Sequence, residues 1–467
     1  MRLKLQWLCA AGLLWASSAN AQTFPVSSIN INGADTNRIN IVVLPDGFLS
    51  TQLDTFKDKV KSIQTYVFSA SPYKEYAKFF NVYSIQVPSA EAGTTHPGTA
   101  TDVTEPASPV QSHNTYFRST YDNGGVHRAV WAQNSSGIFS VLNANFPMYD
   151  VPMVLVNDPE YGGTGGSYIT FSINSSANET AVHELGHTFG KLWDEYWNNM
   201  PGEHPNMTQD NSTVTNVWHK WIGTGGVGIY AHGTSGVEAS WYRPHQNCKM
   251  RFLNVPLCAV CKENIIDRIY DKVNPIDAYI PANTGKIQSS ATPMTFSFTP
   301  VKPNPNTLQY KWTLNGNTIN TTDTNISINE SQLNIGANTL IATVTDTTLM
   351  SRSYTPAKGY MFSVQWTIQR NWTSSVSNIL ADNRFSYSFY PVPAKNTVNL
   401  YCNNNTNATS LDYAITSMTG SVVNSGKMNI NKGEQTVPMN ISGLAAGTYN
   451  ISLRGEGVVI DARIIIE

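Results

Sequence analysis

The pattern of apolar residues changes near Asp277, and this change constrains the fold more than any other feature of the sequence. Before it, β-branched stretches alternate with a stretch of helical periodicity. After it, short alternating runs are separated by Pro, Asn and Gly. Strands alternating with helices predict a mixed α/β domain, whereas short strands between turns predict β-sandwiches. We therefore expect a multidomain chain with an α/β domain first and β-sandwich modules after it.

One helix and three strands can be located in the first part. Apolar residues recur at spacings of three and four between positions 53 and 67, which places them on one face of a helix. The runs at 39–44, 79–87 and 149–158 are rich in β-branched or aromatic residues and predict strands. The first of these strands stops at a Pro-Asp-Gly turn.

Two β-rich modules are expected in the second part. Alternating runs such as 308–314 and 339–344 predict a sandwich of roughly a hundred residues, with Trp312 in its core. A polar linker near 371–383 precedes a smaller module that ends at Glu467. The domain limits that we expect are 1–21, 22–278, 279–372 and 384–467.

The first 21 residues have the pattern of a secretory signal peptide. Arg2 and Lys4 precede an apolar run, and Ala19-Asn20-Ala21 supplies a small-residue cleavage site. No other stretch reaches the roughly 18 apolar residues that a membrane helix requires. We therefore expect a secreted chain without a transmembrane segment.

The charge balance argues against nucleic acid as a partner. The chain has 30 Lys and Arg against 32 Asp and Glu, a formal net charge of -2. Binding to phosphates needs an excess of basic residues. Charged residues make up only 13% of the chain, which is typical of extracellular β-rich proteins.

The segment 178–196 contains the residues best suited to catalysis, in an HExxH arrangement. Asn178 is a plausible helix cap, and on a helix His183 and His187 lie one turn apart, so that both imidazoles can bind one Zn²⁺. Glu184 is placed to take a proton from a water that the metal activates. Gly190 is expected to end the helix and let the chain turn back.

An acidic pair follows the second histidine and can supply a third zinc ligand. Asp194 is the favoured ligand, and Glu195 is the alternative because its longer side chain reaches further. The carboxylate that is not a ligand would brace the histidines. More distant candidates are His204, His219 and His232.

Two segments, one before and one after the HExxH segment, also contain patterns that suggest a function. Upstream, the glycine-rich stretch 162–166 and the strand after it suggest a mobile rim and an exposed strand that pairs with an extended peptide. Downstream, Cys248 is expected to form a disulfide with Cys258 or Cys261, and a structural zinc site that also uses His245 is the alternative. Met250 suggests either a methionine turn beneath the metal or ordinary core packing.

Several of these segments in the same order resemble the M64 family of metallopeptidases, which is named for an immunoglobulin A peptidase. The resemblance rests on LPDGF, FFNVYSIQVPSAEAG, HELGHTFGKLWDEY and YRPHQNCKMRF with LCAVCKENI, and it covers most of 29–269. It implies a zincin-like α/β (α+β) domain with Zn²⁺ as cofactor. It assigns His183 and His187 as metal ligands and Glu184 as general base.

The last module resembles the sorting domain of the type IX secretion system of Bacteroidetes. The segments are FYPVPAKNTVNLY, MTGSVV, ISGLAAGTYNISL and ARIIIE, with Pro-Val-Pro in place of the usual Pro-Asn-Pro. The resemblance implies export across a Gram-negative outer membrane by the type IX machinery, to the medium or the cell surface.

Together these features predict a secreted zinc endopeptidase that acts on extracellular proteins or peptides, with an Ig-like sandwich and a sorting domain. The alternatives are a surface adhesin with an inactive peptidase-like domain and a zinc amidase acting on cell-wall peptides. The intact HExxH argues against the adhesin, because only chemistry requires that glutamate.

Overall fold

The computed structural model describes residues 23–104, 109–196, 201–290, 292–334, 336–352, 360–370, 378–379 and 384–467. The expected signal peptide and most of the expected linker lie outside the described residues.

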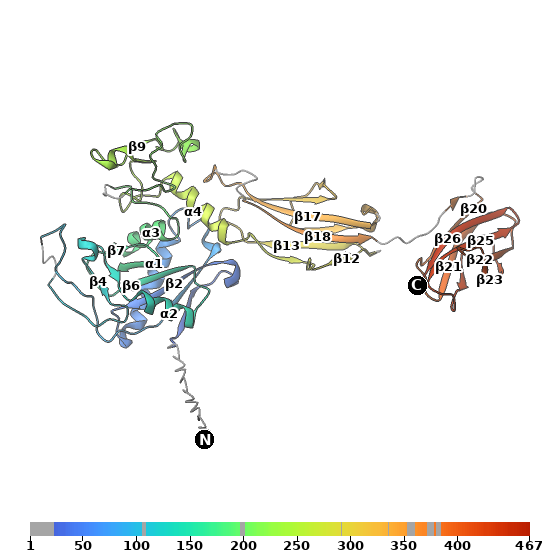
Figure 1. Cartoon of the computed structure of the whole chain (residues 1–467), viewed down its shortest axis with the longest axis horizontal. Helices are drawn as coiled ribbons and strands as arrows, with labels where there is room; N and C mark the ends of the chain where they lie inside the picture. Colours follow the sequence, from blue (N-terminus) through green and yellow to red (C-terminus); the bar gives the residue numbers. More distant parts are fainter. Residues whose placement is uncertain are drawn as a thin grey trace, which may run out of the picture.

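A six-stranded mixed sheet forms the centre of the first domain (Figure 1). Its strands, in spatial order, are β1 (Val26–Asn30), β3 (Phe80–Ile85), β2 (Ile39–Asp46), β6 (Val151–Val156), β8 (Ile169–Ser172) and β7 (Gly163–Thr164). The four inner strands run parallel, and the edge strands β1 and β7 run antiparallel to their neighbours. Every position of the inner strands is buried, because helices cover both faces of the sheet.

Four α-helices pack around this sheet: α1 (Leu53–Val67), α2 (Ser135–Asn145), α3 (Ala177–Thr188) and α4 (Ala259–Lys272). Ile41 and Val43 of β2 share one core with apolar residues of α1, α3 and α4. Val42 and Leu44 point to the opposite face, where their core includes Ile138 of α2. The alternation along one strand therefore divides the helices into two layers.

The remaining elements of the first domain are short. Two small ribbons pair β4 (Ser119–Thr120) with β5 (Trp131–Ala132) and β9 (Tyr230–Ala231) with β10 (Tyr242–Arg243). The 3₁₀ turns of the described chain are η1 (Asp35–Asn37), η2 (Ser50–Gln52), η3 (Ala77–Phe79), η4 (Asn123–Gly125), η5 (His219–Trp221), η6 (Val237–Ser240) and η7 (Glu330–Gln332). The connection between α3 and α4 is thus mostly irregular.

A β-sandwich follows α4. One sheet contains β11 (Ile276–Ile280), β13 (Met294–Pro300) and β16 (Asn325–Ile328). The other contains β12 (Lys286–Gln288), β18 (Met361–Arg370), β17 (Gly336–Asp346), β14 (Leu308–Leu314) and β15 (Asn317–Ile319). Trp312 and Trp366 are fully buried and stack at 5.7 Å between ring centroids, which confirms the predicted core position of Trp312.

The sandwich is docked on the first domain through buried polar contacts. Asp346 at the end of β17 accepts hydrogen bonds from the hydroxyls of Tyr76 and Tyr270, the latter at 2.7 Å. Arg38 forms an ion pair with Asp277 of β11 at 2.8 Å. Because β11 pairs with β13, we propose that the sandwich begins at about Ile276, slightly before the expected limit of 278.

The C-terminal module has a core of its own. One sheet contains β19 (Asn378–Ile379), β20 (Phe385–Tyr390), β21 (Thr397–Asn404) and β24 (Gly433–Asn440). The other contains β23 (Val422–Asn429), β22 (Ser410–Ser417), β25 (Gly447–Gly455) and β26 (Val458–Ile466). The buried apolar cluster between them draws only on residues 385–466. Such a module can fold without the rest of the chain.

Candidate active site

Helix α3 presents the HExxH residues from a buried position. It begins after Ser176, so Asn178 lies inside the first turn and the predicted capping role of Asn178 is wrong. Val182, Leu185 and Phe189 are buried in the core shared with α1 and α4 and fix the rotation of the helix. The opposite face then carries His183 and His187 toward the loop that follows the helix.

The two histidines and Asp194 converge on one point. The Nε2 atoms of His183 and His187 lie 3.1 Å apart, and Oδ1 of Asp194 lies 3.1 Å from each of them. The three side chains are 11%, 18% and 20% exposed, so the group is reachable from solvent. Three donor atoms at these separations, with one open side, can hold one metal ion.

Backbone carbonyls orient both imidazoles. Nδ1 of His183 donates to the carbonyl of Lys249 at 2.9 Å, and Nδ1 of His187 donates to the carbonyl of Leu192 at 2.8 Å. A carbonyl can only accept, so each ring is held with Nε2 available as a ligand atom. The expectation that Glu195 or Asp194 braces the histidines from behind is therefore wrong, because the carbonyls take that place.

The loop after α3 turns sharply and so selects between the two acidic residues. Gly190 approaches the backbone of Gly186 so closely that a Cβ there would lie 2.7 Å from its carbonyl oxygen. Lys191 adopts a left-handed conformation with φ of 54°. After this turn Asp194 faces the histidines, while Glu195 is fully buried on the other side of the loop. The structure thus brings together His183, His187 and Asp194, and it does not bring Glu195 to this group.

The three distant histidines are also not part of the group within the described residues. His204 stacks on Trp193 with ring centroids 4.5 Å apart, and its Nδ1 lies 3.2 Å from the carbonyl of Lys191. Nδ1 of His219 lies 2.8 Å from the carbonyl of Asn216, and His232 is buried elsewhere.

Glu184 lies beneath the glycine-rich loop. A Cβ at Gly163 or Gly165 would come within 2.9 Å of its carboxylate oxygens, so only glycine permits this close approach. Burial raises the pKa of Glu184, while His183 and His187 lower it. Its Oε2 has no hydrogen-bond partner among the described residues. A buried carboxylate with a raised pKa and a free oxygen is suited to accepting and returning a proton.

The predicted exposed strand after the glycines is wrong. β8 is buried at all four positions and is paired on both sides, with β6 and β7. The edge of the sheet is instead β7, formed by Gly163 and Thr164, directly beside Glu184.

Three further side chains surround the site and were missed by the sequence reasoning. The guanidinium of Arg128 lies 5.1 Å from the ring centre of Tyr196, whose ring stacks on His183 at 6.4 Å. Burial raises the pKa of Tyr161, and the nearby Arg128 lowers it. Only Tyr196 lay within a recognised motif, because Arg128 and Tyr161 come from loops with no diagnostic pattern.

Met250 lies directly under the ligand helix. It is fully buried, and a Cβ on Gly186 would lie 2.5 Å from its sulfur, so a glycine between the two histidines is required. The preceding Lys249 forms an ion pair with Glu179 in the first turn of α3. The segment around Met250 therefore supports α3 from below. Because Met250 also belongs to the main apolar core, its position agrees with both alternatives, the methionine turn and core packing.

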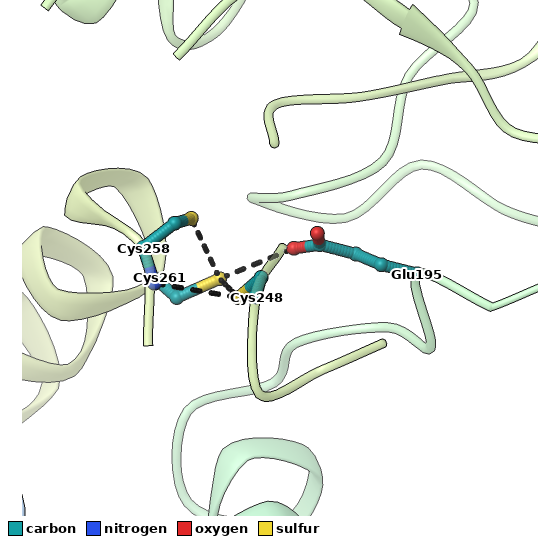
Figure 2. Close-up of side chains that lie close together, drawn as sticks. All are labelled: Glu195, Cys248, Cys258 and Cys261. Atoms are coloured by element: carbon teal, nitrogen blue, oxygen red, sulfur yellow. Dashed lines mark hydrogen bonds between the residues drawn. The ribbon is translucent and has the colours of Figure 1, made fainter. Parts of the chain in front are cut away.

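The cysteines form neither a disulfide nor a site with His245. Cys248, Cys258 and Cys261 are buried free thiols, and the sulfur of Cys248 is 3.7 Å from that of Cys261. Disulfide bonds are about 2.05 Å long, so the expected disulfide is wrong. Nδ1 of His245 accepts a hydrogen bond from the backbone of Asn247, and the fourth polar group beside the sulfurs is Glu195 (Figure 2).

Comparison with known proteins identifies two parts of the chain. Residues 28–226 match the family model of IgA Peptidase M64, and residues 388–467 match that of the secretion system C-terminal sorting domain. Both predicted resemblances are confirmed. Residues 28–226 are thus similar to the M64 peptidases. The type IX sorting domain at 388–467 indicates secretion to the cell surface or the extracellular space and interaction with the secretion machinery.

A search of curated proteins found no match. Solved structures with similarity include SGBP-B of the mixed-linkage glucan utilization locus of Bacteroides ovatus (16% identity, TM-score 0.16, 41% of this chain and 47% of that chain). A second is dimeric latent PorU from Porphyromonas gingivalis (11% identity, TM-score 0.15, 41% of this chain and 20% of that chain). A third is the set of fibronectin(III)-like modules of Clostridium thermocellum CbhA (11% identity, TM-score 0.14, 40% of this chain and 90% of that chain). The match spans less than half the length of the first two proteins, and at these TM-scores none of the three carries an argument. Among the described helices, none has the length and apolar character needed to cross a membrane.

Proposed function

We propose that the chain is a secreted zinc endopeptidase that hydrolyses peptide bonds in extracellular proteins. The observation that supports this most strongly is the convergence of His183, His187 and Asp194 within 3.1 Å, with the buried carboxylate of Glu184 on the same helix. We also propose that the domain is zincin-like, since an antiparallel edge strand runs beside a helix that bears the HExxH residues.

The donor set fits Zn²⁺. Two neutral imidazoles and one carboxylate are typical ligands of catalytic zinc, and a fourth position stays open for water or substrate. The carbonyl partners of both Nδ1 atoms fix the tautomer that such binding needs. When bound, Zn²⁺ supplies Lewis-acid chemistry that acidifies water and polarises a carbonyl.

Residues of the chain provide the proton transfer and the stabilisation of negative charge that the reaction also needs. Glu184 takes a proton from the attacking water and gives it to the leaving amine, so the carboxylate is regenerated in each turnover. Arg128 and Tyr196 lie on the histidine side of the site, where a cation and a hydroxyl stabilise negative charge that develops on the carbonyl oxygen.

The edge strand β7 supplies the means to hold an extended substrate. Its outer edge has no pairing strand among the described residues, and it lies beside Glu184. A peptide that adds to this edge would run across the histidines in an extended form. This arrangement favours hydrolysis within a polypeptide over the amidase and adhesin alternatives.

A peptide-library digest tests the proposal. The purified protein should cleave internal bonds, and a zinc chelator should stop the cleavage. Glu184→Gln should lower kcat/KM by about 10²- to 10⁴-fold with the zinc content unchanged. If this variant binds zinc normally and cleaves as fast as the parent, the general-base assignment is wrong. If the wild type cleaves only cell-wall peptides, the amidase alternative holds.

A further inference from the structure

Behind the candidate active site, a second cluster of metal-ligating side chains is completely enclosed. It consists of Glu195, Cys248, Cys258 and Cys261, all of them buried. Figure 2 shows Cys258 and Cys261 on the first turn of α4, with Cys248 and Glu195 arriving from two separate loops. Their ligand atoms all lie within 4.8 Å of one another.

The three separations that involve the sulfur of Cys261 match those of a tetrahedral metal site. Zn²⁺ with bonds of about 2.3 Å to sulfur and about 2.0 Å to oxygen places two sulfurs about 3.8 Å apart, and sulfur and oxygen about 3.5 Å apart. Here the sulfur of Cys261 lies 3.7 Å from that of Cys248 and 3.5 Å from that of Cys258. Oε1 of Glu195 lies 3.4 Å from the sulfur of Cys261.

Glu195 gives an independent indication of a missing cation. The residue is 0% exposed, and its Oε2 has no hydrogen-bond partner among the described residues. Its other oxygen accepts a hydrogen bond from Asn206 at 3.0 Å. Burial of an unpaired carboxylate is unfavourable, and a bound cation would remove this cost.

The backbone around the sulfurs is arranged for thiolates. The amide of Cys258 donates to the sulfur of Cys248 at 3.3 Å. Cys258 is the N-cap of α4 and Cys261 lies in its first turn, where the helix dipole favours negative charge. The C-x-x-C spacing on a helix start is also the usual spacing of structural zinc ligands.

We propose that Glu195, Cys248, Cys258 and Cys261 bind a second Zn²⁺, which has a structural role. The ion is fully enclosed, and all four positions are taken by protein, so it has no room for water or substrate. It joins the loop that carries Asp194, the segment that carries Met250 and the start of α4. The amide of Glu195 also donates to the carbonyl of Met250 at 2.7 Å, so the two loops are already in contact.

Metal counting on the full chain tests this site separately from the active site. The wild type should hold about two zinc ions per chain, and the His183→Ala/His187→Ala variant should keep about one. Cobalt loaded into that double variant should show the charge-transfer absorption of cobalt bound to thiolates. Further substitution of Cys248→Ser should remove both the last ion and this absorption.

Cys402 provides a matched control, because it is a buried free thiol in the C-terminal module. Cys402→Ser should change neither the zinc content nor the cobalt spectrum. If the Cys248 variant does not fold, the result in the double histidine variant still decides the question. Absence of metal from that variant, or a mass lower by two hydrogens that shows a disulfide among the three cysteines, would overturn the proposal.

Discussion

The two candidate metal clusters are separated by a single peptide bond, between Asp194 and Glu195, yet they differ in their other donor atoms and in their exposure to solvent. The first has two imidazoles and a carboxylate that are partly exposed. The second has three thiols and a carboxylate, all buried. An open site with nitrogen and oxygen donors suits exchangeable water, whereas a closed sulfur-rich site suits permanent binding.

The difference shows how one loop serves two purposes. Asp194 and Glu195 are consecutive, yet their carboxylates belong to two different groups of ligand atoms. Asp194 completes the open group, and Glu195 enters the closed one. A metal held by Glu195 would therefore fix the position of Asp194, and geometry at catalytic ligands controls rates strongly.

Chelation should give the largest contrast between the two clusters. A soluble chelator should abolish peptidase activity quickly, because the first group is open to solvent. The ion at the cysteines should stay bound much longer, since all its ligands are buried. Activity and zinc content followed over time should show complete inactivation after loss of about one ion per chain. Loss of both ions at the same rate would contradict the distinction between an open site at the histidines and an enclosed site at the cysteines.

Single substitutions of Asp194 and of Glu195 should each weaken metal binding at only one of the two clusters. Asp194→Ala should weaken zinc binding at the histidines by at least about 100-fold and leave the ion at the cysteines in place. Glu195→Gln should have the opposite effect, with weaker binding at the cysteines and a smaller loss of activity. Zinc content and kcat/KM measured for both variants show which cluster each substitution affects. If Asp194→Ala keeps both ions and the activity of the parent, the third ligand at the histidines is a different residue.

Zinc binding at the histidine cluster should depend on pH in a defined direction. Burial opposes a charge on His187, but the contact with Asp194 outweighs burial and raises the pKa of His187 to about 9 in the metal-free protein. Below that pKa the incoming ion must displace a proton. Apparent zinc affinity should therefore fall as pH decreases from about 9, by roughly tenfold per unit. Calorimetry in buffers of different ionisation enthalpy should detect release of about one proton at neutral pH.

Removal of the C-terminal module should have the smallest effect on either cluster. Its buried core draws on residues 385–466 alone, and neither metal group includes any of its residues. Truncation after Asn371 should leave kcat/KM within about twofold and the zinc content unchanged, while abolishing secretion in the native host. A folded but inactive truncated protein would show that the module contributes to the active site.

The sequence predicted those parts of the site that depend on local spacing. The helical repeat alone puts His183 and His187 on one face, and the apolar residues between 53 and 67 that were predicted to share a helix face lie in α1. Likewise, the predicted strands at 39–44 and 149–158 overlap β2 and β6. These signals are local, because the spacing of apolar residues within a single helix or strand is enough to identify it.

The parts that the sequence did not predict depend on contacts between distant segments. Spacing cannot show that the chain turns at Lys191 with a positive φ, and this turn separates the roles of Asp194 and Glu195. Nor can it show that Glu195 meets Cys248, because a long irregular connection lies between them. Arg128 was missed for the same reason, since only the folded loops bring it to Tyr196.

That irregular connection has a consequence for the lifetime of the protein outside the cell. Between Glu195 and Cys248 the described chain has only short turns and two-residue strands, so it is the kind of segment that opens locally and is cut by proteases. A secreted peptidase is surrounded by copies of itself, and each copy is an available attacker. Pinning both ends of the connection to one ion limits how far it can open. Resistance to autolysis would then depend on the metal that takes no part in catalysis.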